Sequence, residues 1–99
     1  MKEIEFRNFL INNSDIESKD KSVSSRIAKA LFVERELKVN LENVVKCDEE
    51  MYNLLLQIQE KLDDKRYHNV YQNAVRKYYL FVNNKEFSRL NQYKKTRVL

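Results

Sequence analysis

Side chains that carry covalent catalysis are scarce in this chain of 99 residues, which has one cysteine, Cys47, and one histidine, His68. Nucleophilic catalysis needs a nucleophile with a base beside it. Nothing in the sequence brings Cys47 and His68 together, and Ser22, Ser24 and Ser25 gather at one expected helix start. We therefore expect no enzyme activity, with a Cys47–His68 pair as the remaining catalytic alternative. His68 is assigned to the surface or to a phosphate contact.

Acidic side chains are the next candidates for chemistry, because carboxylates bind hard metal ions. They gather at residues 48–50 and 63–64, but no spacing matches a calcium-binding loop, and the glycine that such a loop requires is missing. A single cysteine also leaves no cysteine-rich zinc site and no disulfide within the chain. The sequence therefore predicts neither a metal ion nor a cofactor.

Two polar strips have the residue types that recognise nucleic acid. Phosphates are contacted by Lys and Arg, and base edges by side chains such as Asn, Gln and Arg. The first strip lies on an apolar helix with i, i+3, i+4, i+7 spacing, and the second follows the outer side of a later helix. The candidate DNA-binding residues are Ser22, Ser25, Arg26, Lys29, Arg66, Asn69, Gln72, Asn73, Arg76 and Lys77. For each residue the alternative is an ordinary solvated helix face, and binding requires both strips to form one surface.

The net charge of +4 is unevenly spread along the chain. Residues 41–64 carry two basic and seven acidic side chains, whereas residues 65–99 carry nine basic and one acidic. Clustered positive charge raises the local concentration of anionic partners. The distribution favours an anion-binding face, and ordinary charged helix surface is the alternative.

The elements that must position these strips are predicted to be helices. The chain contains no Gly and no Pro, residues on which hairpins and phosphate-binding loops depend and which helix interiors avoid. We expect an all-α fold, a compact bundle of four to five helices. The apolar periodicity predicts helices over about residues 2–12, 21–38, 48–62, 66–82 and 85–93, with a short helical turn in the connector 39–47. The second of these helices is expected to be covered by its neighbours on most sides, so that the first polar strip is its one solvent-exposed face.

Local signals refine this expectation. Asp48 is expected to cap the helix that follows it, and asparagines at 12–13, 40 and 83–84 are expected in left-handed turns. Among the tyrosines, the expected core members are Tyr67, Tyr71 and Tyr78, whereas Tyr79 and Tyr93 are less clearly inward.

The chain is expected to form one domain over residues 1–93, with a basic tail at 94–99. No apolar run approaches the roughly 18 residues of a membrane span, and the first residues lack the apolar stretch of a signal peptide. A lone cysteine suits a reducing compartment. We expect a cytoplasmic protein without membrane contact, and its oligomeric state stays open.

Four segments of the chain, residues 6–10, 22–25, 41–48 and 71–81, follow one another in a characteristic order. Together they resemble the helical N-terminal domain of phage integrases (tyrosine recombinases), a SAM-like, core-binding DNA-binding domain also found at the head of some restriction endonucleases. The resemblance implies that the second and fourth helices face duplex DNA, which points to the strips above. The family's usual Thr and Tyr of the second helix are absent, and its catalytic domain is missing from this chain. The resemblance therefore implies a non-catalytic domain, either the targeting part of a recombinase or endonuclease or a free-standing small protein with the same architecture.

The alternative function is contact with another protein. Small phage or mobile-element proteins that inhibit bacterial defence enzymes are often of this size, charge and helicity. In this reading the acidic segment 42–64 mimics nucleic acid or binds a basic partner, and the basic third contacts another subunit.

Overall fold

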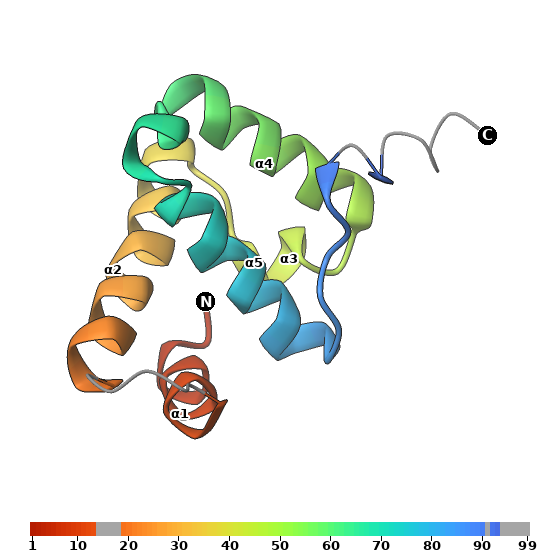
Figure 1. The fold of residues 1–99 in the computed structure, drawn as a ribbon. Helices are drawn as coiled ribbons and strands as arrows, with labels where there is room; N and C mark the ends of the chain where they lie inside the picture. The colour runs from red at the N-terminus through yellow and green to blue at the C-terminus, as the bar shows by residue number, and fades with distance from the viewer. Residues whose placement is uncertain (14–18, 91, 94–99) are drawn as a thin grey trace.

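The computed structural model describes residues 1–13, 19–90 and 92–93, so the basic tail expected at 94–99 lies outside the described part (Figure 1). The elements are α1 (Glu3–Asn13), α2 (Lys19–Leu37), α3 (Leu41–Val44), α4 (Asp48–Lys61), the 3-10 helix η1 (Asp64–Tyr67) and α5 (Val70–Asn83). The described residues contain no strand. The prediction of an all-α bundle of four to five helices is confirmed.

Helix α5 is the centre of the bundle and contacts α1, α2, α3 and α4. Figure 1 shows it between α2 and α4. Ala74 and Tyr78, spaced i, i+4, form one buried line, and Val75 and Tyr79 form a second beside it. Because two sides of α5 are covered, only a narrow strip of this helix faces solvent.

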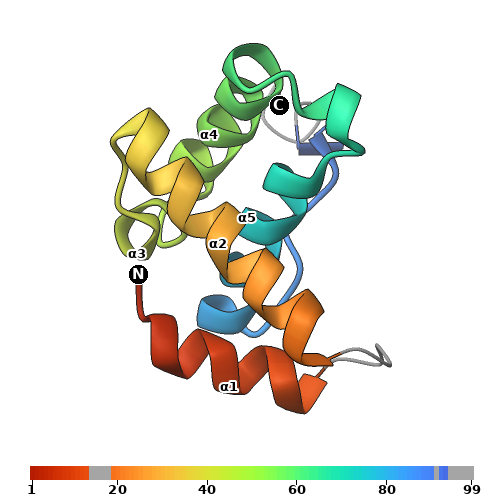
Figure 2. The ribbon, with the colours of Figure 1, turned by 90° about the vertical axis from the view of Figure 1, so that its left-hand side faces the viewer.

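Helix α2 is buried along one line of residues rather than all round. Its four core side chains, Val23, Ile27, Ala30 and Val33, follow helical spacing and are at most 3% exposed. The helix packs chiefly on α1 and α5, and Figure 2 shows it running across α5 with α1 below both. The prediction that α2 is wrapped by neighbours is wrong, because Leu31 is 37% exposed on its uncovered side.

Aromatic rings fill the space between α1 and α5. Phe6 is fully buried, with its ring centroid 5.0 Å from that of Tyr78 in an edge-to-face arrangement and 5.7 Å from that of Phe81. Edge-to-face pairs of this kind contribute about 0.5–1.5 kcal/mol beyond the burial itself. These contacts fix the N-terminal helix on the centre of the bundle.

Two tyrosines occupy places that differ from the prediction. Tyr67, expected in the core, is 49% exposed because it lies on η1 and not on α5. Tyr79, expected to be less clearly inward, is only 2% exposed. Its hydroxyl donates to Asp48 Oδ1 at 2.7 Å, which satisfies the one polar atom of an otherwise apolar environment.

The start of α5 also differs from the prediction, which began this helix at residue 66. The chain instead forms η1 and then two left-handed residues, His68 (φ 59°) and Asn69 (φ 61°). The carboxylate of Asp64 is fully buried and accepts hydrogen bonds from the backbone N–H groups of Tyr71 (3.0 Å) and Gln72 (2.8 Å). These are donors that the first turn of a helix leaves unpaired. Asp64 therefore fixes where α5 begins.

The turns use fewer asparagines than expected. Left-handed backbone in the described part occurs at Lys38, Asp63, His68, Asn69 and Asn84, so Asn84 alone of the predicted turn asparagines adopts it.

The N-terminal caps of α3 and α4 also differ from the prediction. Asn40 is extended and instead caps α3, its Oδ1 accepting from the N–H of Glu42 at 2.9 Å. The prediction for Asp48 is corrected by one residue, since Cys47 is the N-cap of α4 and Asp48 is its first residue.

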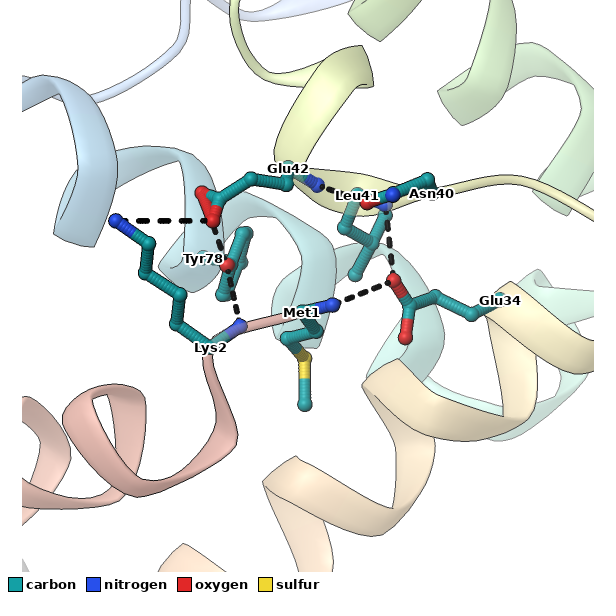
Figure 3. A network of polar contacts seen from close by, with 7 residues as sticks. All are labelled: Met1, Lys2, Glu34, Asn40, Leu41, Glu42 and Tyr78. Carbon is teal, nitrogen blue, oxygen red and sulfur yellow. Dashed lines mark hydrogen bonds and ion pairs between the residues drawn. The ribbon is translucent and has the colours of Figure 1, made fainter.

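A polar network joins the beginning of the chain to α2, α3 and α5 (Figure 3). Glu34 Oε2 accepts from the N–H of Leu41 at 2.9 Å and lies 3.4 Å from the amino group of Met1. The hydroxyl of Tyr78 accepts from the N–H of Lys2 at 2.9 Å and donates to Glu42 Oε1 at 3.2 Å. These bonds satisfy backbone N–H groups that no helix pairs.

The segment after α5 is helical over less of its length than the predicted range 85–93. Residues 84–89 are irregular, residues 90 and 92–93 have helical backbone, and the chain turns back toward α4 (Figure 1). Phe87 packs edge-on against Tyr79 with ring centroids 5.1 Å apart, and Tyr93 lies 4.9 Å from Tyr52 of α4. These aromatic contacts place the segment beside α5, and at its end the N–H of Tyr93 donates a helical hydrogen bond to the backbone oxygen of Arg89 at 2.9 Å.

Candidate nucleic-acid interface

The solvent-facing strip of α5 opens on a hollow of about 690 Å³ that α2 and the segment after α5 help to form. On α5 the lining positions follow i, i+4, i+7, i+8, i+11 spacing from Asn69, which is one side of a helix. The described residues that line the hollow are Arg26, Asn69, Asn73, Arg76, Lys77, Leu80, Glu86, Phe87 and Arg89.

The structure brings residues of both predicted strips into this hollow. Arg26 comes from α2, and Asn73, Arg76 and Lys77 come from α5, with Asn69 directly before it. The requirement that Arg26 and Arg76 lie on the same side of the molecule is therefore met.

Five other predicted residues do not line the hollow, namely Ser22, Ser25, Lys29, Arg66 and Gln72. Lys29 Nζ donates to Ser25 Oγ at 2.6 Å, a contact within the exposed surface of α2. Ser22 is half-buried on the same helix. Arg66 lies on η1, where its guanidinium carbon is 5.9 Å from the centroid of the Tyr67 ring.

The prediction that Gln72 belongs to an exposed strip is wrong. Its side chain is 5% exposed and turns toward α4, where its Oε1 accepts from Gln59 Nε2 at 3.2 Å. Its own Nε2 donates to Asn69 Oδ1 at 3.3 Å. Gln72 lies one position before Asn73, on the side of α5 that α4 covers, so it cannot reach a ligand in the hollow.

Arg76 has a structural role in addition to its charge. Its Nη1 donates to the backbone oxygens of Phe87 (3.1 Å) and Ser88 (3.2 Å), which fastens the segment after α5 to the helix. Burial, and then the positive charge of Arg89, lower the pKa of Arg76, and the carboxylate of Glu86 opposes this shift. Arg76 stays charged because a guanidinium is not deprotonated in proteins.

The hollow carries an excess of positive charge. Among the described residues, four cationic side chains line it, those of Arg26, Arg76, Lys77 and Arg89, against one carboxylate, that of Glu86. None of the four lies within 4.0 Å of a carboxylate among the described residues. Because a concave surface concentrates the field of its charges, the chemistry of this hollow favours an anion.

Sequence reasoning missed Leu80, Glu86, Phe87 and Arg89. The spacing from Asn69 through Lys77 extends to Leu80, so helical spacing could have identified that residue. Arg89 had no such signal, because the segment that carries it is irregular and its position depends on the Tyr79–Phe87 contact and on the bonds from Arg76.

The two residues considered for catalysis are well separated. Cys47 precedes α4, and His68 follows η1 beyond the other end of that helix. A helix of 14 residues spans about 20 Å at 1.5 Å per residue. The described residues include no group of three or more His, Cys, Asp or Glu side chains able to hold a metal ion. Within the same residues, no helix has the length and apolar character needed to cross a membrane.

Comparison of the chain with protein-family models, with curated protein sequences and with solved structures gives no match. The resemblance to integrase N-terminal domains stays a prediction from the sequence.

Proposed function

We propose that this chain is a non-catalytic domain that binds duplex DNA through the face formed by α2, α5 and the segment after α5. The observation that carries the proposal is the gathering of Arg26, Arg76, Lys77 and Arg89, from three separate elements, around one hollow with a single carboxylate. The resemblance to integrase N-terminal domains supports the same face, and in that setting the domain targets a recombinase or a restriction endonuclease.

The residues that line the hollow have different proposed roles according to their type. Arg26, Lys77 and Arg89 neutralise backbone phosphates, and each contact releases counterions from the DNA. Asn73, exposed between them, presents an amide that can donate to and accept from a base edge. Arg76 keeps the surface together by holding the backbone of residues 87 and 88.

Charge reversal tests the proposal. Lys77→Glu is expected to weaken binding to a short duplex at low salt on the order of tenfold, because one favourable charge becomes a repulsive one. Lys61→Glu is the matched control, since Lys61 is exposed on the acidic helix α4, away from the hollow. Equal affinities for wild type and both variants, measured by fluorescence anisotropy, would refute DNA binding through this face.

A second candidate function, contact with a partner protein, is favoured by a separate surface. Tyr67 is 49% exposed beside Arg66, and on α2 the guanidinium carbon of Arg35 lies 5.3 Å from the centroid of the Phe32 ring. Tyr and Arg are the residue types that dominate binding energy in protein interfaces. If the chain is a small phage protein that inhibits a defence enzyme, this is the face that binds the enzyme. A partner that stays bound after nuclease treatment of a bacterial lysate and is lost in Tyr67→Ala supports this role, whereas a partner indifferent to Tyr67→Ala contradicts it.

A further inference from the structure

The size of the hollow exceeds what phosphate contacts alone require. A DNA backbone that passes over a protein surface contacts its phosphates with projecting side chains and needs no recess. The hollow measures about 690 Å³, within the range of about 300–1,000 Å³ that is typical of sites for small organic ligands. Its size therefore suits a group larger than a phosphate.

The lining offers two kinds of surface to such a group. Arg26, Lys77 and Arg89 supply positive charge, whereas Leu80 and Phe87 supply apolar wall. A nucleotide has the matching division, with an anionic phosphate at one end and a flat, largely apolar base at the other.

Asn73 supplies the means to read a base. Its side chain is exposed at the hollow and has no hydrogen-bond partner among the described residues, so both its amide N–H and its amide oxygen are available. An asparagine amide pairs with adenine through N6 and N7. Asn69 is less free, because its Oδ1 already accepts from Gln72.

The wall of the hollow is held in place before any ligand arrives. Arg76 bonds the backbone at residues 87 and 88, and Phe87 is 7% exposed against Tyr79. A preformed site loses less conformational entropy on binding than one that must be ordered.

We infer that the hollow accommodates one unpaired nucleotide of the bound DNA, with a preference for adenine read by Asn73. This inference rests on the proposed function, because the same cations hold the flanking phosphates. In a duplex with a single-nucleotide bulge, the extra base leaves the stack and enters the hollow, and the rest of the duplex crosses the basic face.

The test compares a perfect duplex with duplexes that carry one bulged adenine or one bulged cytosine, with free dAMP as a further probe. We expect the adenine bulge to bind at least about fivefold more tightly than the cytosine bulge. Asn73→Leu, of similar size, is expected to abolish the difference in affinity between the adenine bulge and the cytosine bulge. Asn53→Leu, exposed on α4, is the matched control, and far-UV circular dichroism checks that both variants fold.

The outcomes separate this inference from the proposed function. Equal affinity for all three duplexes would overturn the nucleotide site and leave DNA binding intact. No affinity for any duplex would overturn both proposals. Binding of dAMP without binding of any duplex would contradict DNA as the source of the nucleotide, and an adenine preference that persists in Asn73→Leu would overturn the role of Asn73.

Discussion

Substitution of Asp64, whose carboxylate is buried, is the most direct stability test of α5 and of the hollow that α5 lines. Asp64 is 0% exposed and accepts two backbone N–H groups of the first turn of α5, at 3.0 and 2.8 Å. Its negative charge also lies at the positive end of the helix dipole. Asp64→Ala removes both acceptors and the charge together.

The expected loss follows from those two bonds. The N–H of Gln72 donates in a buried hydrogen bond, and a buried donor left without an acceptor costs about 1–3 kcal/mol. The N–H of Tyr71 is part-buried, so its loss resembles removal of a helix cap, about 0.5–2 kcal/mol. We expect Asp64→Ala to lower the free energy of unfolding by about 2–4 kcal/mol. At about 5 °C per kcal/mol, Tm falls by roughly 10–20 °C.

Urea denaturation followed by far-UV circular dichroism measures this loss. Asp64→Asn keeps one acceptor oxygen and is expected to lose about half as much. Asp63→Asn is the control, since Asp63 is exposed, makes no side-chain cap bond and has a left-handed backbone that asparagine also tolerates. An Asp64→Ala variant within about 0.5 kcal/mol of wild type, the range of an ordinary surface change, would refute the capping role.

Two further predictions concern the tyrosines and Arg76. Burial, as the largest cause, raises the pKa of Tyr78 and of Tyr79 from 10.0 to about 12, so the fold favours the neutral phenols. Stability is therefore expected to be full below pH 10 and to fall between pH 10 and pH 12, and an unchanged urea midpoint across that window would contradict the burial of these hydroxyls. Arg76→Ala is expected to lower the free energy of unfolding by about 1–3 kcal/mol and to change the near-UV circular dichroism of Phe87 and Tyr79. An unaltered near-UV spectrum would show that Arg76 does not hold the segment.

The sequence predicted the class of fold because its strongest signals are local. The absence of Gly and Pro and the regular apolar spacing required no knowledge of neighbouring elements. The helix expected over 48–62 is observed as Asp48–Lys61. Here apolar periodicity and the acidic first turn agree, and no tertiary contact overrides them.

The start of α5 was not predictable in the same way. Arg66 and Asn69 fit the polar strip of a helix that continued back to residue 66, so the spacing alone favoured a longer helix. The helix does not continue back to residue 66, because the carboxylate of Asp64 is buried against the first turn of α5 and caps it. His68 and Asn69, which precede α5, have left-handed backbone instead. Such a cap depends on the chain folding back on itself, which periodicity does not encode.

The candidate site likewise contains residues that helical spacing predicted and residues whose positions depend on tertiary contacts. Arg26, Asn73, Arg76 and Lys77 were found from helical spacing, because each lies on an uncovered side of its helix. Gln72 was assigned to that side by the same helical spacing, whereas its amide is satisfied by Gln59 of α4. In the sequence, a buried polar side chain that has a hydrogen-bond partner cannot be told from an exposed one.

The salt dependence of duplex binding tests the central claim most directly, namely that cations from α2, α5 and the following segment act on one DNA molecule. Three phosphate contacts, from Arg26, Lys77 and Arg89, predict a slope of log K against log salt near −2.7, and each lost contact reduces its magnitude by about 0.9. The account predicts that reduction in Arg26→Gln and again, additively, when Lys77→Gln is combined with it. Affinity that stays flat as salt rises, or a slope that neither substitution changes, would contradict the account.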